Sequence, residues 1–309
     1  LSGRTLVAFV SDESHYSVKM AINVLGIGLD HLISIPCDAD GKMDVAALSQ
    51  EIDNQKRAGR MPFCVVATAG TTVRGAFDPL PEIAEVCARE YLWLHVDAAW
   101  GGAALLSPKH RSLLAGIDLA DSLCWDPHKL MGMPISCSVF LARKANTLAK
   151  ACSHGDEANY LFHEENARVD RGRISLQCGR RVDALKLWLA WKSLGHSGWQ
   201  ERVDRCMETA AELEAKVRSH ARLVLMSERQ FTNVCLRYEP ADSDGVDLDA
   251  LNSSIRERIS TGGRFMVTKA MLGGQVIIRP VIANPDVDGA MLDELLTEIV
   301  RHGDELSGS

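Results

Sequence analysis

The sequence contains one lysine whose surroundings suggest covalent chemistry. Lys129 lies in the segment SLCWDPHKL (122–130), after an apolar run and a proline turn, and an apolar stretch containing glycine follows it. A lysine held in such a dry setting becomes an amine that reacts with carbonyl groups to form an imine. The neighbouring His128 could donate a hydrogen bond to a phosphate. The alternative for Lys129 is a solvated lysine in a surface loop, which is the commoner setting for this residue type.

Three further polar residues also follow β-rich runs. Asp97 lies within WLHVDAAWGG, Thr68 begins TAGTT, and His15 lies within SDESHYS. In an open α/β sheet, ligands bind at the carboxyl ends of the strands, so all three could face one site. Taken singly, each has an ordinary explanation. Asp97 could cap a helix or a turn, Thr68 could belong to a turn, and His15 could be a structural hydrogen-bonding residue.

Together these four residues suit pyridoxal 5′-phosphate (PLP). A lysine forms an imine with this cofactor, a carboxylate keeps its pyridine nitrogen protonated so that the ring accepts electrons, and a flat side chain stacks on the ring. Lys129, Asp97 and His15 match these three needs. Thr68 offers a small side chain where a flat, phosphorylated ligand could approach. The sequence therefore predicts a PLP site at one edge of a sheet.

The elements that must position these residues alternate between strands and helices. Consecutive apolar residues in the strands favour a parallel sheet that is covered on both faces. Residues 78–90 carry prolines in the first turn and apolar residues at helical spacing, so they predict an amphipathic helix and a right-handed βαβ unit. The expected fold class is α/β, with a doubly wound, mostly parallel sheet. The predicted strands are Leu6–Val10, His31–Pro36, Phe63–Ala69, Trp93–Ala98, Ser122–Trp125 and Ser138–Ala142.

The pattern changes near residue 180. Residues 182–194 predict an apolar helix that ends at the stop signal Gly195–Gly198. We therefore expect a large cofactor-binding domain over residues 1–195, incomplete at its N-terminus, and a small C-terminal α+β domain over residues 196–309. The elements predicted for the small domain are a charged helix near 199–221, a strand at 232–238, a helix near 247–259, a strand at 276–281 and a helix at 288–302.

Several long motifs resemble one known family. In chain order they are SDESHYS, ATAGTTVRGAFDP, WLHVDAAWGG, WDPHKLMG, CSVFLAR, NYLF, QCGRRVDALKLWLAWK, TNVCLRY and IRPVIANP. The sequence resembles the group II PLP-dependent amino acid decarboxylases of fold type I, and most closely their glutamate and cysteine sulfinate decarboxylase branch. The match is specific because several independent motifs agree. It covers only the C-terminal portion of the family's fold.

The resemblance implies three catalytic residues, Lys129, Asp97 and His15. Lys129 forms the imine with PLP, and Asp97 pairs with the pyridine nitrogen. His15 stacks on one face of the ring, and Ala99 packs on the other.

The resemblance also implies further contacts around the cofactor and the substrate. Thr68 and His95 lie near the ring and its substituents. His128 helps to hold the phosphate together with Asp126, although many members of the family have asparagine at the position of Asp126. Arg279 binds the α-carboxylate of the substrate, and the alternative for this arginine is a surface ion pair. No metal site is implied.

The implied reaction is the decarboxylation of a small, acidic L-amino acid to the corresponding amine and carbon dioxide, so the resemblance implies a lyase of amino acid metabolism. Within the enzyme class, the alternative is a diaminobutyrate-type or aromatic amino acid decarboxylase. From a different class, the alternative is a non-catalytic subunit or pseudoenzyme of a split decarboxylase.

The sequence departs from the family in two places. The mobile loop before QCGR, which often carries a tyrosine that delivers a proton to Cα, is represented by His163–Arg173 and contains no tyrosine; Val169 stands at about the matching place. We therefore expect water, His128 or His15 to deliver that proton; the alternative is poor protonation with an altered outcome, such as oxidative deamination or a transaminase-like side reaction. The family's Gly/Ser-rich turn, whose helix N-terminus cradles the phosphate, has no counterpart in this sequence. We expect a companion chain to supply that N-terminal part; the alternative is that the sequence is a processed or truncated fragment of a longer chain.

The composition limits the binding partners and the cellular compartment that we expect for the protein. The net charge is −7 and no basic run stands out, so nucleic acid is not an expected partner. The uncharged stretch Leu130–Ala142 is too short and too polar to span a bilayer. Nine dispersed cysteines without CxxC spacing indicate reduced thiols and a cytoplasmic location. The family's dimers predict homodimer-type pairing, as a dimer or, with the companion chain, a heterotetramer.

Overall fold

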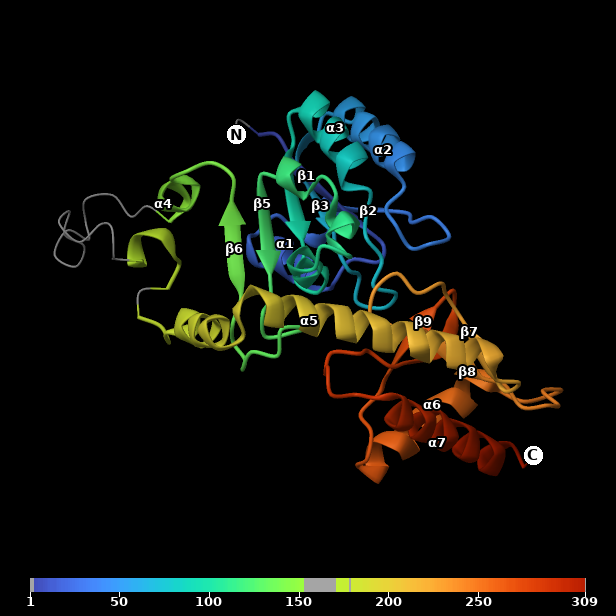
Figure 1. Ribbon diagram of the computed structural model, residues 1–309. Helices are drawn as coiled ribbons and strands as arrows, with labels where there is room; N and C mark the ends of the chain where they lie inside the picture. Colours follow the sequence, from blue (N-terminus) through green and yellow to red (C-terminus); the bar gives the residue numbers. More distant parts are fainter. Residues whose placement is uncertain (1–2, 153–170, 178, 309) are drawn as a thin grey trace.

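A computed structural model describes residues 3–152, 171–177 and 179–308 of the chain. Its larger sheet has six strands in the order β2-β1-β3-β4-β5-β6 (Figure 1). β1 to β5 run parallel, and β6 pairs antiparallel with β5 at one edge. The predicted α/β class and its mostly parallel sheet are therefore confirmed. The strands are β1 (Leu6–Ser11), β2 (Leu32–Ile35), β3 (Met61–Thr68), β4 (Trp93–Asp97), β5 (Ser122–Trp125) and β6 (Val139–Ala142).

Helices α2 (Val45–Arg57) and α3 (Leu80–Glu90) lie side by side on one face of this sheet, at the top of Figure 1. The Asp44 carboxylate caps α2 by accepting hydrogen bonds from two backbone N–H groups of the first turn. α3 is the amphipathic helix predicted from its prolines and apolar spacing, and it buries its apolar side against β3 and β4. The remaining helical segments of this part are α1 (Ser17–Val24), α4 (Thr147–Ala151) and the short 3-10 turns Leu29–His31, Gly101–Leu106, Arg111–Leu114, Ile117–Leu119 and Gly172–Ile174.

Helix α5 (Asp183–Ser219) connects the two parts of the molecule and runs along the lower side of the large sheet in Figure 1. The sequence predicts one helix that ends at Gly195–Gly198 and another that begins near residue 199. The structure instead places a kink at Gly195 alone, where φ is 65° and ψ is −173°, and the chain is helical on both sides of it. Only glycine adopts this backbone conformation readily, so the stop signal produces a kink rather than a loop.

The small sheet is antiparallel, with strand order β7-β8-β10-β9. The predicted strand 232–238 is shorter than expected, because only its last three residues form β8, while Asn233 makes an isolated bridge to Val281. The sequence analysis missed β7 and β9. The elements are β7 (Leu223–Leu225), β8 (Leu236–Tyr238), α6 (Leu248–Gly262), β9 (Thr268–Leu272), β10 (Gln275–Arg279) and α7 (Gly289–Ser307).

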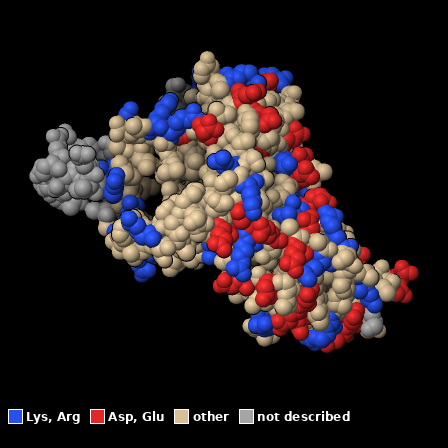
Figure 2. Space-filling view, in the orientation of Figure 1, with Lys and Arg blue, Asp and Glu red and all other residues tan. Residues whose placement is uncertain are grey.

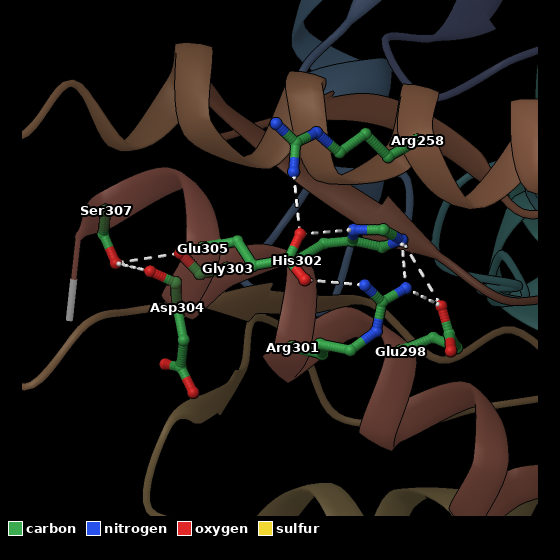
Figure 3. A network of polar contacts seen from close by, with 8 residues as sticks. All are labelled: Arg258, Glu298, Arg301, His302, Gly303, Asp304, Glu305 and Ser307. Atoms are coloured by element: carbon green, nitrogen blue, oxygen red, sulfur yellow. Dashed lines mark hydrogen bonds and ion pairs between the residues drawn. The ribbon is translucent and has the colours of Figure 1, made fainter.

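Ion pairs connect α6 and α7 on the surface of the small domain (Figure 3). Arg258 of α6 reaches Glu305 of α7 at 2.9 Å, and Glu305 also pairs with Arg301 at 2.7 Å. Glu298 binds Arg301 at 2.6 Å and His302 at 3.3 Å. Such exposed pairs contribute little to stability, so the apolar contacts between the helices hold them together.

A single apolar core continues from the large sheet into the small domain. It includes Phe9 of β1, Trp199 of α5 and Tyr238 of β8, all fully buried. The two sheets are therefore held in a fixed arrangement through α5. Within the described ranges, no helix is both long enough and apolar enough to cross a membrane.

Candidate active site

The carboxyl ends of three adjacent strands bring the predicted site residues to one edge of the large sheet. Thr68 ends β3 and Asp97 ends β4, and these two residues are partners across the strands. On its other side, Asp97 is the partner of Cys124 in β5. The chain then leaves β5 at Trp125 and reaches Lys129 after one turn. This is the edge at which α/β sheets bind ligands.

The Asp97 carboxylate is held through one of its oxygens. Oδ1 accepts a hydrogen bond from the backbone N–H of Ala99 at 3.1 Å and from the thiol of Cys124 at 3.4 Å. Within the described residues no hydrogen bond reaches Oδ2, so this oxygen is available to a ligand. Ala99 follows in the turn that leaves the strand, and its packing on a cofactor ring stays a prediction.

Lys129 is half-exposed and lies close to a carboxylate. Its amine is 3.2 Å from Asp126 Oδ2, and His128 Nε2 is 3.8 Å from the same oxygen. The other nitrogen of His128, Nδ1, lies 2.8 Å from the carbonyl oxygen and 3.3 Å from the amide nitrogen of Cys137. The structure thus brings Asp126, His128 and Lys129 together. The Asp126 charge faces the lysine, and its predicted contact with a phosphate stays a prediction.

Thr68 is fixed by a buried carboxylate that the sequence analysis missed. Its backbone N–H donates to Asp78 Oδ2 at 2.7 Å, and Asp78 Oδ1 accepts from the backbone N–H of Met43, also at 2.7 Å. Burial raises the pKa of Asp78 to about 6, against the opposing effect of these two hydrogen bonds. Thr68 Oγ1 is buried and has no hydrogen-bond partner among the described residues.

His95 lies on the same side of β4 as Asp97, two residues before it. Its Nδ1 is 2.8 Å from Ser122 Oγ, and its ring stacks on Phe140 with centroids 5.9 Å apart and an interplanar angle of 16°. Burial lowers the pKa of His95, while the charge of Asp97 opposes that shift. Burial prevails, so the ring is neutral at physiological pH.

His15 lies in the loop after β1, and β1 neighbours β3 in the sheet. Its Nδ1 is 2.7 Å from Ser17 Oγ, and its ring contacts Tyr16 at a centroid distance of 4.3 Å. These contacts keep His15 within its own loop. Its stacking on a cofactor ring stays a prediction.

Arg279, in the small domain, contacts the loop that follows the site residue Thr68. It is the last residue of β10, and its guanidinium donates to the carbonyl oxygen of Thr72, in the loop that follows Thr68. Its Nε is buried without a hydrogen-bond partner in the part of the chain that the structure describes. Burial lowers the pKa of Arg279, but arginine keeps its charge at physiological pH. A half-buried cation with a free donor suits an anionic substrate group better than the surface ion pair considered above.

Comparison with known proteins identifies the family. Residues 3–239 match the model of the pyridoxal-dependent decarboxylase conserved domain. The chain belongs to the pyridoxal-dependent decarboxylase family. It is 40% identical over 313 aligned residues to acidic amino acid decarboxylase GADL1 of Bos taurus and 41% identical to cysteine sulfinic acid decarboxylase of Rattus norvegicus, in each case over 97% of this chain.

Solved structures of relatives share the whole fold described here. A crystal structure of mouse CSAD matches 98% of the chain with a TM-score of 0.91 and 38% identity. A structure of Oryza sativa TDC with PLP and tryptamine matches 98% with a TM-score of 0.90 and 27% identity. The chain spans 60% and 63% of the two curated relatives and 65% of the mouse CSAD chain, so the complete fold of these relatives is larger.

PLP is the cofactor of the pyridoxal-dependent decarboxylase family, and the residues at this edge fit it. The Lys129 amine can bond to its aldehyde, and Asp97 Oδ2 is available for its ring nitrogen. The unpartnered hydroxyl of Thr68 suits a polar substituent of the ring, since buried polar atoms normally have a partner. His128 would meet the phosphate. The described residues therefore bring to one edge of the sheet a lysine, a carboxylate and a hydroxyl that suit the aldehyde and ring of PLP.

Three residues that hold His95, Asp97 and Thr68 in place could not be found from the sequence: Ser122, Cys124 and Asp78. The one signal in the sequence for Ser122 and Cys124 was their spacing. They occupy alternate positions of a predicted strand, so their side chains share one face of the sheet. Asp78 lies in the motif GAFDP, and the residues around it in the sequence do not indicate which group it binds.

Proposed function

We propose that the chain carries the catalytic centre of a PLP-dependent carboxy-lyase that converts a small acidic L-amino acid to an amine and carbon dioxide. The convergence of Thr68, Asp97 and Lys129 on one sheet edge, together with the contact of Arg279 with the loop after Thr68, carries this proposal. The names of the relatives, acidic amino acid decarboxylase and cysteine sulfinic acid decarboxylase, support the acidic class of substrate.

Each residue has a distinct task in this proposal. Bound PLP supplies the electron sink for the electron pair that remains at Cα when the carboxylate leaves. Lys129 supplies the amine that attaches the cofactor and gives way to the substrate's amino group. Asp97 keeps a proton on the ring nitrogen through its Oδ2, and Arg279 binds the substrate's α-carboxylate. The remaining side chains, His15, His95, Ala99, Asp126 and His128, orient the ring and its phosphate.

The proton that completes the reaction at Cα comes, in this proposal, from water, His128 or His15. The loop residues 163–170, which include Val169, lie outside the described residues, and so does Tyr160 of the NYLF motif. Among the candidates, His128 is favoured by its position next to Lys129 in the sequence.

Exposed apolar side chains support a partner polypeptide. Val24 of α1 is 81% exposed, Ile135 is 81% exposed and Trp188 of α5 is 55% exposed. In Figure 2, charged residues gather over the small domain at the lower right, whereas a largely uncharged area covers β6 and the first half of α5. Exposed apolar side chains and uncharged areas are typical of protein interfaces.

The large sheet itself gives a second argument for such a partner. On β4, Leu94 and Val96 are buried beneath the helices, but Trp93, His95 and Asp97 on the opposite face are only half-buried. Parallel sheets are normally covered on both faces. We propose that a companion chain carrying the rest of the relatives' fold covers this face and cradles the phosphate, and that the assembly pairs as a dimer or heterotetramer.

Native mass spectrometry tests the companion chain. The proposal predicts a complex that contains the 33.8 kDa chain together with a second, different polypeptide. A cofactor-loaded species built from the 33.8 kDa chain alone would contradict it.

We also propose a division into domains at residue 195, and a cytoplasmic location. The kink at Gly195 lies between the large sheet and the small sheet along α5, which supports that boundary. The eight cysteines in the described ranges are all free thiols, which supports a reducing compartment.

An absorption spectrum combined with carbon dioxide release tests the catalytic proposal. The purified assembly with PLP should show a visible band that Lys129→Ala abolishes and the exposed control Lys144→Ala retains. Aspartate, glutamate or cysteine sulfinate should release carbon dioxide faster than 2,4-diaminobutyrate or tryptophan. A band that survives Lys129→Ala would refute the role of this lysine, and preference for the latter two substrates would refute the acidic class. Cofactor binding without carbon dioxide release from any of them would favour a non-catalytic subunit.

A further inference from the structure

We propose that Ser122 and Cys124 of β5 are positioning residues that hold His95 and Asp97 of β4 in their working orientation. The inference rests on the proposed function, because it assigns a task to residues behind the same site. The two strands are parallel, with His95 opposite Ser122 and Asp97 opposite Cys124. Alternate residues of a strand share a face, so all four side chains lie on one side of the sheet.

The Cys124 thiol acts as a hydrogen-bond donor toward Asp97. Its Sγ is 3.4 Å from Asp97 Oδ1, the oxygen that also accepts the Ala99 N–H. Burial, together with the charge of Asp97, raises the pKa of Cys124 to about 12, so the sulfur keeps its proton at physiological pH. Two donors on Oδ1 fix the plane of the carboxylate and direct Oδ2 toward the ligand.

Ser122 fixes the tautomer of His95 by a similar arrangement. The indole N–H of Trp93 lies 2.8 Å from Ser122 Oγ, and an indole can only donate. The serine oxygen therefore accepts from Trp93, and its own O–H is free to donate to His95 Nδ1 at 2.8 Å. If Nδ1 carried the proton instead, the buried serine hydroxyl would have no acceptor, which buried polar groups avoid.

The consequence is a neutral His95 that presents Nε2–H. Phe140 holds the plane of the ring by stacking on it. The strand next to the site therefore sets both the direction of the Asp97 carboxylate and the donor that His95 offers. A purely structural role for Ser122 and Cys124 would stabilise the sheet without affecting cofactor binding.

The first test uses paired variants of Cys124 in the complete assembly. Cys124→Ala removes the donor and Cys124→Ser retains one. We expect Cys124→Ala to weaken PLP binding about three- to tenfold, the range for one lost hydrogen bond, and to change the absorption spectrum of the bound cofactor. Cys124→Ser should restore both. Unchanged binding and spectrum in Cys124→Ala, with wild-type protein that binds PLP, would overturn the inference and leave the proposed function intact.

Two measurements need no cofactor. The infrared S–H stretch of Cys124, isolated by subtracting the Cys124→Ala spectrum, should lie at the frequency of a bonded thiol and move to that of a free thiol in Asp97→Ala. In ¹⁵N NMR of labelled histidine, the His95 signals should show protonated Nε2, and Ser122→Ala should disturb them. A free-thiol frequency in the wild-type protein, or a protonated Nδ1, would overturn the inference. Wild-type protein that fails to bind PLP at all would refute the proposed function, and this inference with it.

Discussion

Replacing Asp78 with asparagine separates the charge of this residue from its size. The carboxylate is buried behind the site, where its two oxygens accept the backbone N–H groups of Thr68 and Met43. Burial raises the pKa of Asp78 from 3.8 to about 6, so the folded state binds a proton at pH values where the unfolded state has lost it. The stability that follows from this difference is complete below the unfolded-state pKa and is lost as the pH rises through about 6.

The size of this effect follows from the shift. Two pKa units correspond to about 3 kcal/mol of unfolding free energy. The asparagine side chain does not titrate. The free energy of unfolding of wild type minus that of Asp78→Asn should therefore decrease by about 2 to 3 kcal/mol between about pH 4 and pH 7. All other titrating groups are common to both proteins and cancel in the difference.

Urea unfolding of both proteins across this pH range measures the change. Glu90→Gln provides a control of opposite sign, because Lys56 and then Arg89 lower the pKa of Glu90. The stability that Glu90 contributes is present above its unfolded-state pKa and is lost as the pH falls. The free energy of unfolding of wild type minus that of Glu90→Gln should therefore grow as the pH rises. A wild-type minus Asp78→Asn difference that is constant with pH would refute the reasoning.

Three further predictions follow from the site and the fold. Asp97→Asn should lower kcat at least about a hundredfold with unchanged circular dichroism, because it removes the charge that holds the ring proton; steady-state kinetics near wild-type rates would contradict this. Arg279→Gln should raise KM for the amino acid substrate about ten- to a hundredfold, the range for one charged hydrogen bond, and an unchanged KM would exclude the predicted carboxylate contact. Gly195→Ala should lower the free energy of unfolding by about 1 to 3 kcal/mol. Backbone strain alone causes this loss, since no atom lies within 4 Å of the added methyl carbon. Denaturant midpoints equal to wild type would show that the kink does not need glycine.

The large sheet could be predicted from sequence because its strands are apolar on consecutive positions, and each is followed by small or polar residues. Strand β9 could not be found this way, since only Leu272 of its five residues is buried. The Gly273-Gly274 pair between β9 and β10, both with positive φ, was the available hairpin signal.

Some residues of the site could likewise be predicted from the sequence, and others could not. Lys129 and Asp97 could be placed at the sheet edge because each follows a recognisable strand. Asp78 and Cys124 could not be assigned a task, because their partners Met43 and Asp97 lie 35 and 27 residues away along the chain. Strand register and loop packing decide such contacts, and neither is written in the local pattern of residues.

The covalent attachment of PLP to Lys129 is the central claim. Borohydride reduction of the assembly with PLP, followed by peptide mass spectrometry, locks the cofactor onto the amine to which it is bonded. The account predicts a reduced pyridoxyl phosphate group on the peptide that contains Lys129, at near-complete occupancy and at no other lysine. An unmodified Lys129, or the group on a different lysine, would contradict it.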